Sequence, residues 1–153
     1  MRLNKLFAGL VLAFVLLGLQ FNTFAQDDLP ALELNKPLTG EVELKKSNSY
    51  EIKIDSAQYL YVLVEFQGTD LDVKLSEKGK TLYKSGNLSG GPRVKTVHYV
   101  TENAGDYVLE IISGPSERRN VKYRVTVKEI RNATEKDRVF ADDIEKGIEV
   151  IQK

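Results

Sequence analysis

Apolar and polar residues alternate with a period of two along most of the chain between residues 38 and 130. In the stretch "SYEIKID", one side carries the apolar residues Tyr50, Ile52 and Ile54, and the other side is charged. The stretch "KYRVTVKE" repeats the pattern with Tyr123, Val125 and Val127. A period of two is typical of β-strands, and one wet side predicts half-buried antiparallel strands.

The stretch "YLYVLVEF" (59–66) is apolar on both sides, which predicts a central strand that is covered on both faces for part of its length. Shorter strand candidates lie near Val42, Val73, Leu82, Val97 and Leu109. Gly, Asn and Pro residues between them mark turns. About eight short strands with such turns predict an all-β fold, an antiparallel jelly-roll β-sandwich.

After Ile130 the period changes from two to that of a helix. Thr134 is placed to cap a helix N-terminus. One stripe of a 3.6-residue period then carries Phe140, Ile144, Ile148 and Ile151. The sequence therefore predicts a C-terminal amphipathic helix within residues 132–153. Its stripe either packs on the sandwich or docks a protein partner or a second copy of the chain.

The first 25 residues have the pattern of a signal peptide. Arg2 and Lys5 precede an apolar run, and Thr23 and Ala25 supply the small residues that a signal peptidase reads. The apolar run is shorter than the ~20 residues that a spanning helix needs. We therefore expect cleavage after Ala25, a secreted or periplasmic protein, and no membrane contact after cleavage. A retained anchor is the alternative.

The composition of the remaining chain narrows the functional classes. Without Arg2 and Lys5 the 22 basic residues become 20, so against 22 acidic residues the net charge is −2. No basic stripe stands out, so nucleic acid is not expected as a partner. The chain has no Cys, so its core must hold without disulfides. We expect a lead-in segment (26–36), one sandwich domain (37–131) and the helix (132–153).

The order of these stretches resembles that of a known family. The stretches "NSYEIKIDSAQYLYVLVE", "GTDLDVKLSEKGKTLYKSG", "ENAGDYVLEI" and "VKYRVTVKEI" are similar to the bacterial pre-peptidase C-terminal domain, over about residues 36–145. The stretch "RNATEKDRVFADDIE" resembles the form that precedes tetratricopeptide repeats and a caspase-like CHAT domain in secreted bacterial proteins. The resemblance implies a jelly-roll sandwich with an accessory role in secretion, folding or substrate contact.

Asp70 and Asp72 lie one residue apart in a turn between two strand candidates. Asp-rich extracellular turns can bind calcium, and the resemblance includes calcium-binding members, although their ligand positions do not match this chain. A catalytic carboxylate pair is a second interpretation. The favoured one is structural, with Asp70 bonded to its own turn, Leu71 and Val73 pointing inward and Asp72 facing solvent. Calcium is the one cofactor left open.

His98 is the only histidine of the chain, and Val97 and Tyr99 flank it. One His without Cys or spaced acids does not make a zinc site, and no serine sits in a nucleophile elbow. We expect a partly exposed strand histidine and a protein that is not an enzyme.

Four of the seven tyrosines could line an outer surface, where flat rings suit sugar or peptide contacts: Tyr59, Tyr61, Tyr83 and Tyr99. The alternative is that they cover the second face of a central strand or receive the C-terminal helix. The sequence thus indicates a non-catalytic extracytoplasmic accessory module that binds a protein or positions a larger assembly. A polysaccharide-binding module is the alternative, and a calcium-stabilised accessory domain of a secreted hydrolase is the third interpretation.

Overall fold

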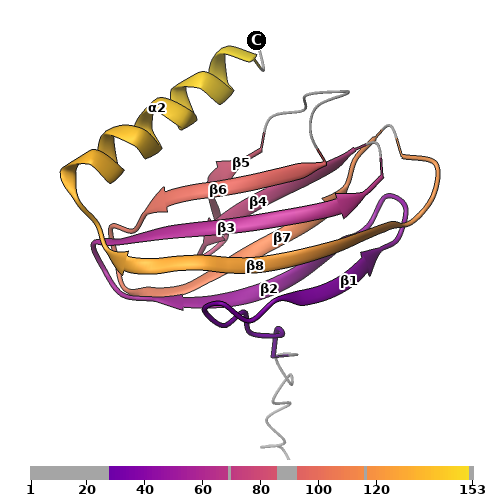
Figure 1. The fold of residues 1–153 in the computed structure, drawn as a ribbon, viewed down its shortest axis with the longest axis horizontal. Helices are drawn as coiled ribbons and strands as arrows, with labels where there is room; N and C mark the ends of the chain where they lie inside the picture. Colours follow the sequence, from indigo (N-terminus) through magenta and orange to yellow (C-terminus); the bar gives the residue numbers. More distant parts are fainter. Residues whose placement is uncertain (1–27, 69, 86–92, 116, 152–153) are drawn as a thin grey trace, which may run out of the picture.

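The computed structural model of the protein describes residues 28–68, 70–85, 93–115 and 117–151. These residues form eight β-strands in two stacked sheets, followed by one helix (Figure 1). The expected signal peptide (1–25) and the loop "GNLSGG" lie outside the described residues.

Each sheet has four strands. The front sheet contains, in spatial order, β1 (Leu38–Val42), β8 (Val121–Asn132), β3 (Gln58–Gln67) and β6 (Val94–Val100). The back sheet contains β2 (Ser47–Ile54), β7 (Gly105–Ser113), β4 (Leu71–Glu77) and β5 (Lys80–Lys84).

All neighbouring strands are antiparallel, and the chain passes back and forth between the sheets. This strand order is that of an eight-stranded jelly roll, so the predicted fold class is confirmed. β3 lies between β8 and β6, as expected for the strand that is apolar on both sides.

The core lies between the two sheets and follows the alternation of the sequence. Leu60, Val62 and Val64 of β3 are fully buried, and the residues between them face outward. Burying side chains of this kind stabilises the fold by roughly 1.5–3 kcal/mol each. Three tyrosines that the pattern assigns to core faces are also buried: Tyr50, Tyr107 and Tyr123.

The lead-in segment closes one side of the sandwich, beside β1 and β2. Pro30 and Pro37 predict an irregular lead-in, but Leu32 N–H donates to the Glu51 carbonyl (2.8 Å) and Glu51 N–H donates to the Pro30 carbonyl (3.0 Å). Pro30 is tolerated because it acts here as an acceptor and needs no N–H. Asn35 N–H then donates to the Val127 carbonyl in the front sheet (2.8 Å).

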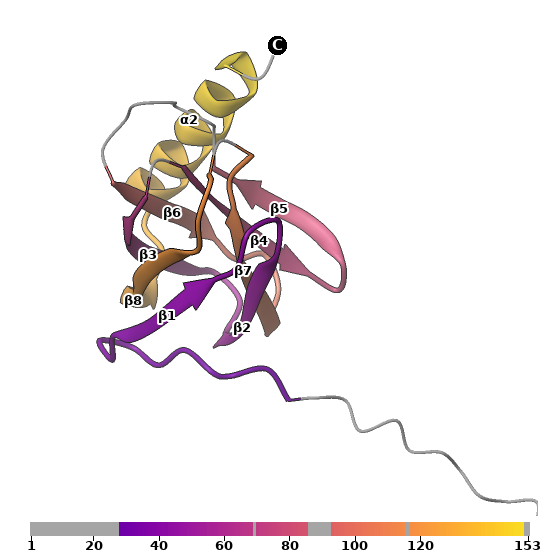
Figure 2. The ribbon, with the colours of Figure 1, turned by 90° about the vertical axis from the view of Figure 1, so that its right-hand side faces the viewer.

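The helix α2 (Glu135–Ile151) follows β8 after two residues and lies on the opposite side, beside β6 (Figures 1 and 2). Ile144 is half-buried and packs against the core. The predicted positions Ile148 and Ile151 belong to α2, but their side chains lie outside the described ones. In the described part of the chain, we find no helix with the length and apolar character that crossing a membrane requires.

Candidate functional site

The outer face of the front sheet changes character along the strands. Register pairs Tyr61 of β3 with His98 of β6 and, further along, Glu65 of β3 with Arg124 of β8. Because side chains alternate between faces, these residues all point away from the core. One end of the face is therefore aromatic and the other end is charged.

At the aromatic end, four rings meet. Tyr61 stacks on His98 with ring centroids 4.6 Å apart, and Phe140 of α2 meets the same imidazole edge-on at 5.1 Å. The Tyr59 hydroxyl is hydrogen-bonded to His98 Nδ1 (2.6 Å). We call Tyr59, Tyr61, His98 and Phe140 the aromatic cluster. Through Phe140 and His98 the cluster attaches the first turns of α2 to the sheet. Each aromatic pair of this kind contributes about 0.5–1.5 kcal/mol to stability.

An ion pair fixes the start of α2 beside this cluster. The Arg131 guanidinium lies 4.5 Å above the Tyr59 ring centroid and donates two hydrogen bonds to the Asp137 carboxylate (2.7 and 2.8 Å). Asp137 also accepts from the Thr134 backbone N–H (2.7 Å), as in a capping box. Arg131 holds the pKa of the Asp137 carboxyl well below its usual range. The predicted cap, Thr134, thus lies at a helix start that is tied to the sheet.

His98 is half-buried in the cluster, as expected for a partly exposed strand histidine. Burial lowers its pKa from the usual 6.5, and the nearby Glu129 carboxylate opposes that shift. Burial also raises the pKa of the Tyr59 hydroxyl. The imidazole of His98 therefore favours its neutral form. In that form Nδ1 shares one hydrogen bond with the Tyr59 hydroxyl, and the face of the ring packs on Tyr61.

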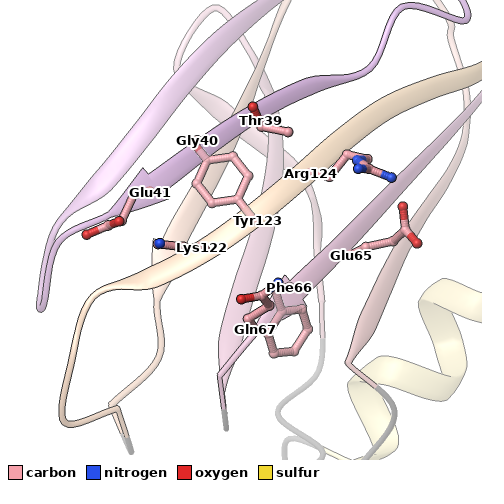
Figure 3. A pocket seen from close by; sticks show the side chains of 9 residues that line it. All are labelled: Thr39, Gly40, Glu41, Glu65, Phe66, Gln67, Lys122, Tyr123 and Arg124. Atoms are coloured by element: carbon pink, nitrogen blue, oxygen red, sulfur yellow. The ribbon is translucent and has the colours of Figure 1, made fainter.

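At the charged end, the outer face carries a shallow cleft of 520 Å³. We call it the charged cleft (Figure 3), and it is lined by Thr39, Gly40, Glu41, Glu65, Phe66, Gln67, Lys122, Tyr123 and Arg124. Within the described residues, the side chains of Lys122, Arg124 and Glu65 form no ion pair within 4.0 Å and no hydrogen bond. Glu41 accepts from the Asn120 amide (2.9 Å). Charges of both signs are thus left available to a ligand.

The floor of the charged cleft depends on the close approach of Tyr123 to Gly40. The Tyr123 ring lies against Gly40 (Figure 3), where a Cβ on Gly40 would lie 2.6 Å from the Tyr123 hydroxyl. That hydroxyl accepts from the Asn48 amide (2.7 Å) and is hydrogen-bonded to the Tyr50 hydroxyl. Burial, followed by this bond to Tyr123, raises the pKa of Tyr50. The glycine therefore gives Tyr123 the space to reach the back sheet.

A second pocket, of 350 Å³, lies between α2 and the strands β5 and β6. We call it the edge pocket. Its lining consists of Lys80, Thr81, Leu82, Tyr83, His98, Tyr99, Val100, Glu102, Arg138, Ala141 and Asp142. It was not foreseen, because the sequence does not show that α2 returns to β6.

The four tyrosines proposed as ligand contacts do not share one surface. Tyr59 and Tyr61 belong to the aromatic cluster, and Tyr59 is only 6% exposed. Tyr83 is 8% exposed, and its hydroxyl donates to the Thr96 carbonyl (2.8 Å). Tyr99 pairs with the buried Leu60, and its ring lies 6.3 Å from that of Tyr107. Tyr83 and Tyr99 therefore contact the space between the sheets, because their register places them on the inner faces.

The acidic turn also differs from its expected exposure. Leu71 and Val73 point inward, as predicted, but Asp72 is 8% exposed, so the expectation that it faces solvent is wrong. Burial, and then the nearby Asp70, raise the pKa of Asp72, while Lys95 and Lys84 oppose the shift. Asp72 is thus buried near Lys84 of β5 and Lys95 of β6.

Asp70 is also buried, and the loop after β7 holds it. Its N–H donates to Glu117 Oε1 (2.6 Å), and a Cβ on Gly114 would lie 2.3 Å from its carboxyl carbon. Within the described residues, no group of three His, Asp or Glu side chains is placed to hold a metal ion. Calcium binding at Asp70 and Asp72 stays a prediction.

No protein-family model matches the chain, and its sequence matches no curated protein. Among solved structures it is similar to the pre-peptidase C-terminal domain of collagenase from Bacillus anthracis, with 16% identity and a TM-score of 0.52. The match covers 65% of this chain and 94% of that domain. The two share a fold. The fold that the sequence resemblance implies is therefore supported, and the likeness does not extend to the repeat-containing context.

The chain is also similar to PliG, a periplasmic lysozyme inhibitor of g-type lysozyme. The match to PliG from Salmonella Typhimurium has 16% identity and a TM-score of 0.45, and it covers 64% of this chain and 96% of that chain. The match to PliG from Aeromonas hydrophila has 9% identity and a TM-score of 0.44. It covers 66% of this chain and 98% of that chain. Likeness at this level describes an arrangement of strands and carries no statement about function.

Proposed function

We propose that the protein is a non-catalytic, extracytoplasmic binding module that holds a protein partner on the outer face of its front sheet. The observation that carries this proposal is the charged cleft. Its exposed Lys122, Arg124 and Glu65 have no partner among the described residues. Arg is enriched in protein interfaces, and complementary charges give an interface its specificity and orientation.

Three further features support the proposal. The only histidine, the side chain most often used as a general base, is hydrogen-bonded to Tyr59 and packed between Tyr61 and Phe140. The signal-peptide pattern of residues 1–25 favours a secreted or periplasmic location. The sequence resemblance to forms that precede tetratricopeptide repeats favours a role in positioning a larger assembly.

The partner surface extends onto α2. Val139 and Phe140 are 53% and 49% exposed although both are large and apolar. Phe140 belongs to the aromatic cluster and Val139 precedes it in α2, so the outer face continues onto the helix. Protein interfaces commonly combine apolar anchors with charged residues, and here the two lie at the two ends of one face.

The test compares two charge reversals on the same strand. Lys122→Glu changes the charged cleft, and Lys128→Glu makes the same change at an exposed position of β8 outside the cleft. Wild type and both variants are used to capture partners from an extracytoplasmic extract, and the captured proteins are quantified. We expect a partner that wild type and Lys128→Glu retain and that Lys122→Glu loses at least tenfold.

Equal retention by the two variants would contradict the proposal. Specific binding on a glycan array that disappears with Tyr61→Ala, and not with Lys122→Glu, would instead favour the polysaccharide-binding alternative. Solution mass identifies the remaining outcome, in which the partner is a second copy of the chain.

A further inference from the structure

We infer that the free edge of β6, together with α2, forms a second binding site, which takes one extended polypeptide segment of a partner protein as an added β-strand. This site is separate from the charged cleft and goes beyond the proposed function. It rests on three observations: β6 is the last strand of its sheet, alternate backbone groups of β6 point away from the sheet, and charged side chains line the edge pocket.

β6 is the last strand of the front sheet, and only β3 pairs with it. Phe66 N–H donates to the Arg93 carbonyl (3.0 Å) and Thr101 N–H donates to the Gln58 carbonyl (2.9 Å). The odd-numbered residues of this segment therefore direct their backbone groups toward β3. In an antiparallel strand the direction alternates, so Thr96, His98 and Val100 direct theirs away from the sheet.

A side-chain contact supports this assignment. The Tyr83 hydroxyl of β5 donates to the Thr96 carbonyl (2.8 Å), which places that carbonyl on the β5 side of β6. His98 and Val100 follow at intervals of two and line the edge pocket. Within the described residues, their backbone groups have no hydrogen-bond partner on that side. The pocket thus contains two consecutive pairs of open donors and acceptors.

Open N–H and C=O groups at a sheet edge are what β-strand addition uses, and main-chain bonds then supply the affinity. The pocket volume of 350 Å³ is near the low end of the range for ligand pockets. A helix is about 10 Å across with its side chains, so an extended chain fits this space better. Ala141 is the small residue that α2 presents to the pocket, which leaves room beside β6.

The pocket also offers specificity. Lys80 and Arg138 supply positive charge, and Glu102 and Asp142 supply negative charge; all four line the pocket and are exposed. Within the described residues, none of these four side chains takes part in an ion pair within 4.0 Å. A bound strand directs alternate side chains to opposite sides, so charged side chains on it can pair with these groups.

The test uses proline, which removes an N–H without disturbing the ladder to β3. Val100→Pro removes an N–H in the edge pocket. Val94→Pro removes an edge N–H of the same strand that lies outside the pocket, and it is the matched control. Proline is tolerated in edge strands where the missing N–H points away from the sheet. Thermal unfolding of both variants checks the fold.

The probe is a phage-displayed library of random eight-residue peptides, selected on the wild-type protein. We expect enriched peptides whose affinity falls at least tenfold with Val100→Pro and less than twofold with Val94→Pro. Synthetic versions of one enriched peptide, N-methylated at one residue at a time, test the same bonds from the other side. Loss of binding should alternate along the peptide with a period of two.

The inference is overturned if no peptide is enriched above a bare-matrix control, or if Val100→Pro binds the enriched peptides as wild type does. If Val100→Pro fails to fold, a methylation pattern without the period of two overturns it. Peptides that are lost with Lys122→Glu and kept with Val100→Pro assign binding to the charged cleft. That result would overturn this inference and leave the proposed function standing.

Discussion

The two sides of the sandwich are closed in different ways. On the β1–β2 side, the lead-in is hydrogen-bonded through its backbone to Glu51 in the back sheet and to Val127 in the front sheet. Beneath it, the Tyr123 hydroxyl connects the sheets through Asn48 and Tyr50. On the β5–β6 side, the contacts are made by side chains, from Tyr83 to Thr96 and from Phe140 to His98.

This difference gives the two sides different roles: the β1–β2 side holds the sheets together, and the β5–β6 side can bind another chain. Backbone bonds to the lead-in occupy groups of Glu51 and Val127, which are then no longer available to another chain. Side-chain contacts hold α2 near β6 but leave the backbone groups of His98 and Val100 open. On the β1–β2 side the lead-in therefore occupies these backbone positions of β2 and β8, whereas the edge of β6 beside α2 stays accessible to an added strand.

The largest effect is expected from Tyr123→Ala, which removes the buried ring that connects the two sheets on the β1–β2 side. Truncation of a buried aromatic residue costs about 3–5 kcal/mol of unfolding free energy. Chemical denaturation measures this loss. Tyr123→Phe keeps the ring and loses the hydroxyl, so it should cost only about 1 kcal/mol. If Tyr123→Ala lost less unfolding free energy than the loss of about 1 kcal/mol expected for Tyr123→Phe, the β1–β2 side would not be the side that holds the two sheets together.

Gly40→Ala should destabilise the same side through crowding instead of loss of contact. Its Cβ would lie 2.6 Å from the Tyr123 hydroxyl, and the bond to Asn48 limits how far Tyr123 can move. Overpacking of this kind costs about 1–3 kcal/mol. Gly105→Ala is the control, because its Cβ would meet only Glu77, at an ordinary distance of 3.5 Å. Equal midpoints for the two variants in denaturant would rule out this crowding.

Phe140→Ala tests the β5–β6 side. The side chain is 49% exposed and its main contact is the edge of His98, so the loss should be about 1 kcal/mol. It should appear as faster amide exchange within α2, with the sandwich itself unchanged. Val139→Ala is the matched control, since Val139 is the preceding residue of α2, is similarly exposed (53%) and carries no ring of its own. Slower folding or a destabilised β1–β2 side would contradict the separation of the two sides.

The pH dependence that comes from His98 should be confined to the β5–β6 side. Burial lowers the pKa of His98, so the folded state binds its proton less tightly than the open state. The contribution to stability is complete above about pH 6.5 and is lost as the pH falls below it. The protection factors of the α2 amides, corrected for the intrinsic pH dependence of exchange and followed against pH, measure this loss. Glu129 opposes the shift and limits its size, and Arg138 and Asp142 are charged groups of α2 that line the edge pocket with His98.

A variant without the titrating group sharpens this test. His98→Phe keeps an aromatic side chain next to Tyr61 and Phe140. The protection factors of its α2 amides, corrected for the intrinsic pH dependence of exchange, should be the same at pH 7 and pH 5. If the variant retains the wild-type pH response, another group is responsible.

Much of the fold follows from the sequence, because alternation is a local property. Ile52, Val62 and Val125 each occupy the buried side that the period of two assigns to them. The capping position of Thr134 is local as well, and it lies at the start of α2.

The sites were less predictable, because each depends on which strands become neighbours. Glu41, Glu65 and Arg124 are distant in sequence and meet only because β8 lies between β1 and β3. Asp72 has the alternation of an exposed residue, but both it and Asp70 are buried in the folded chain. Tyr83 and Tyr99 lie between the sheets because of their register, which composition does not reveal.

The most direct test of the difference between the two sides is amide hydrogen exchange in the free protein, resolved by residue with NMR. The N–H groups of Leu32, Glu51 and Asn35, which are bonded on the β1–β2 side, should be strongly protected. Those of His98 and Val100 should exchange quickly, whereas the N–H of Val97, which the register directs toward β3, should be protected. Protection of His98 and Val100 equal to that of Glu51 would contradict an open β6 edge, and rapid exchange of Leu32 and Glu51 would contradict a closed β1–β2 side.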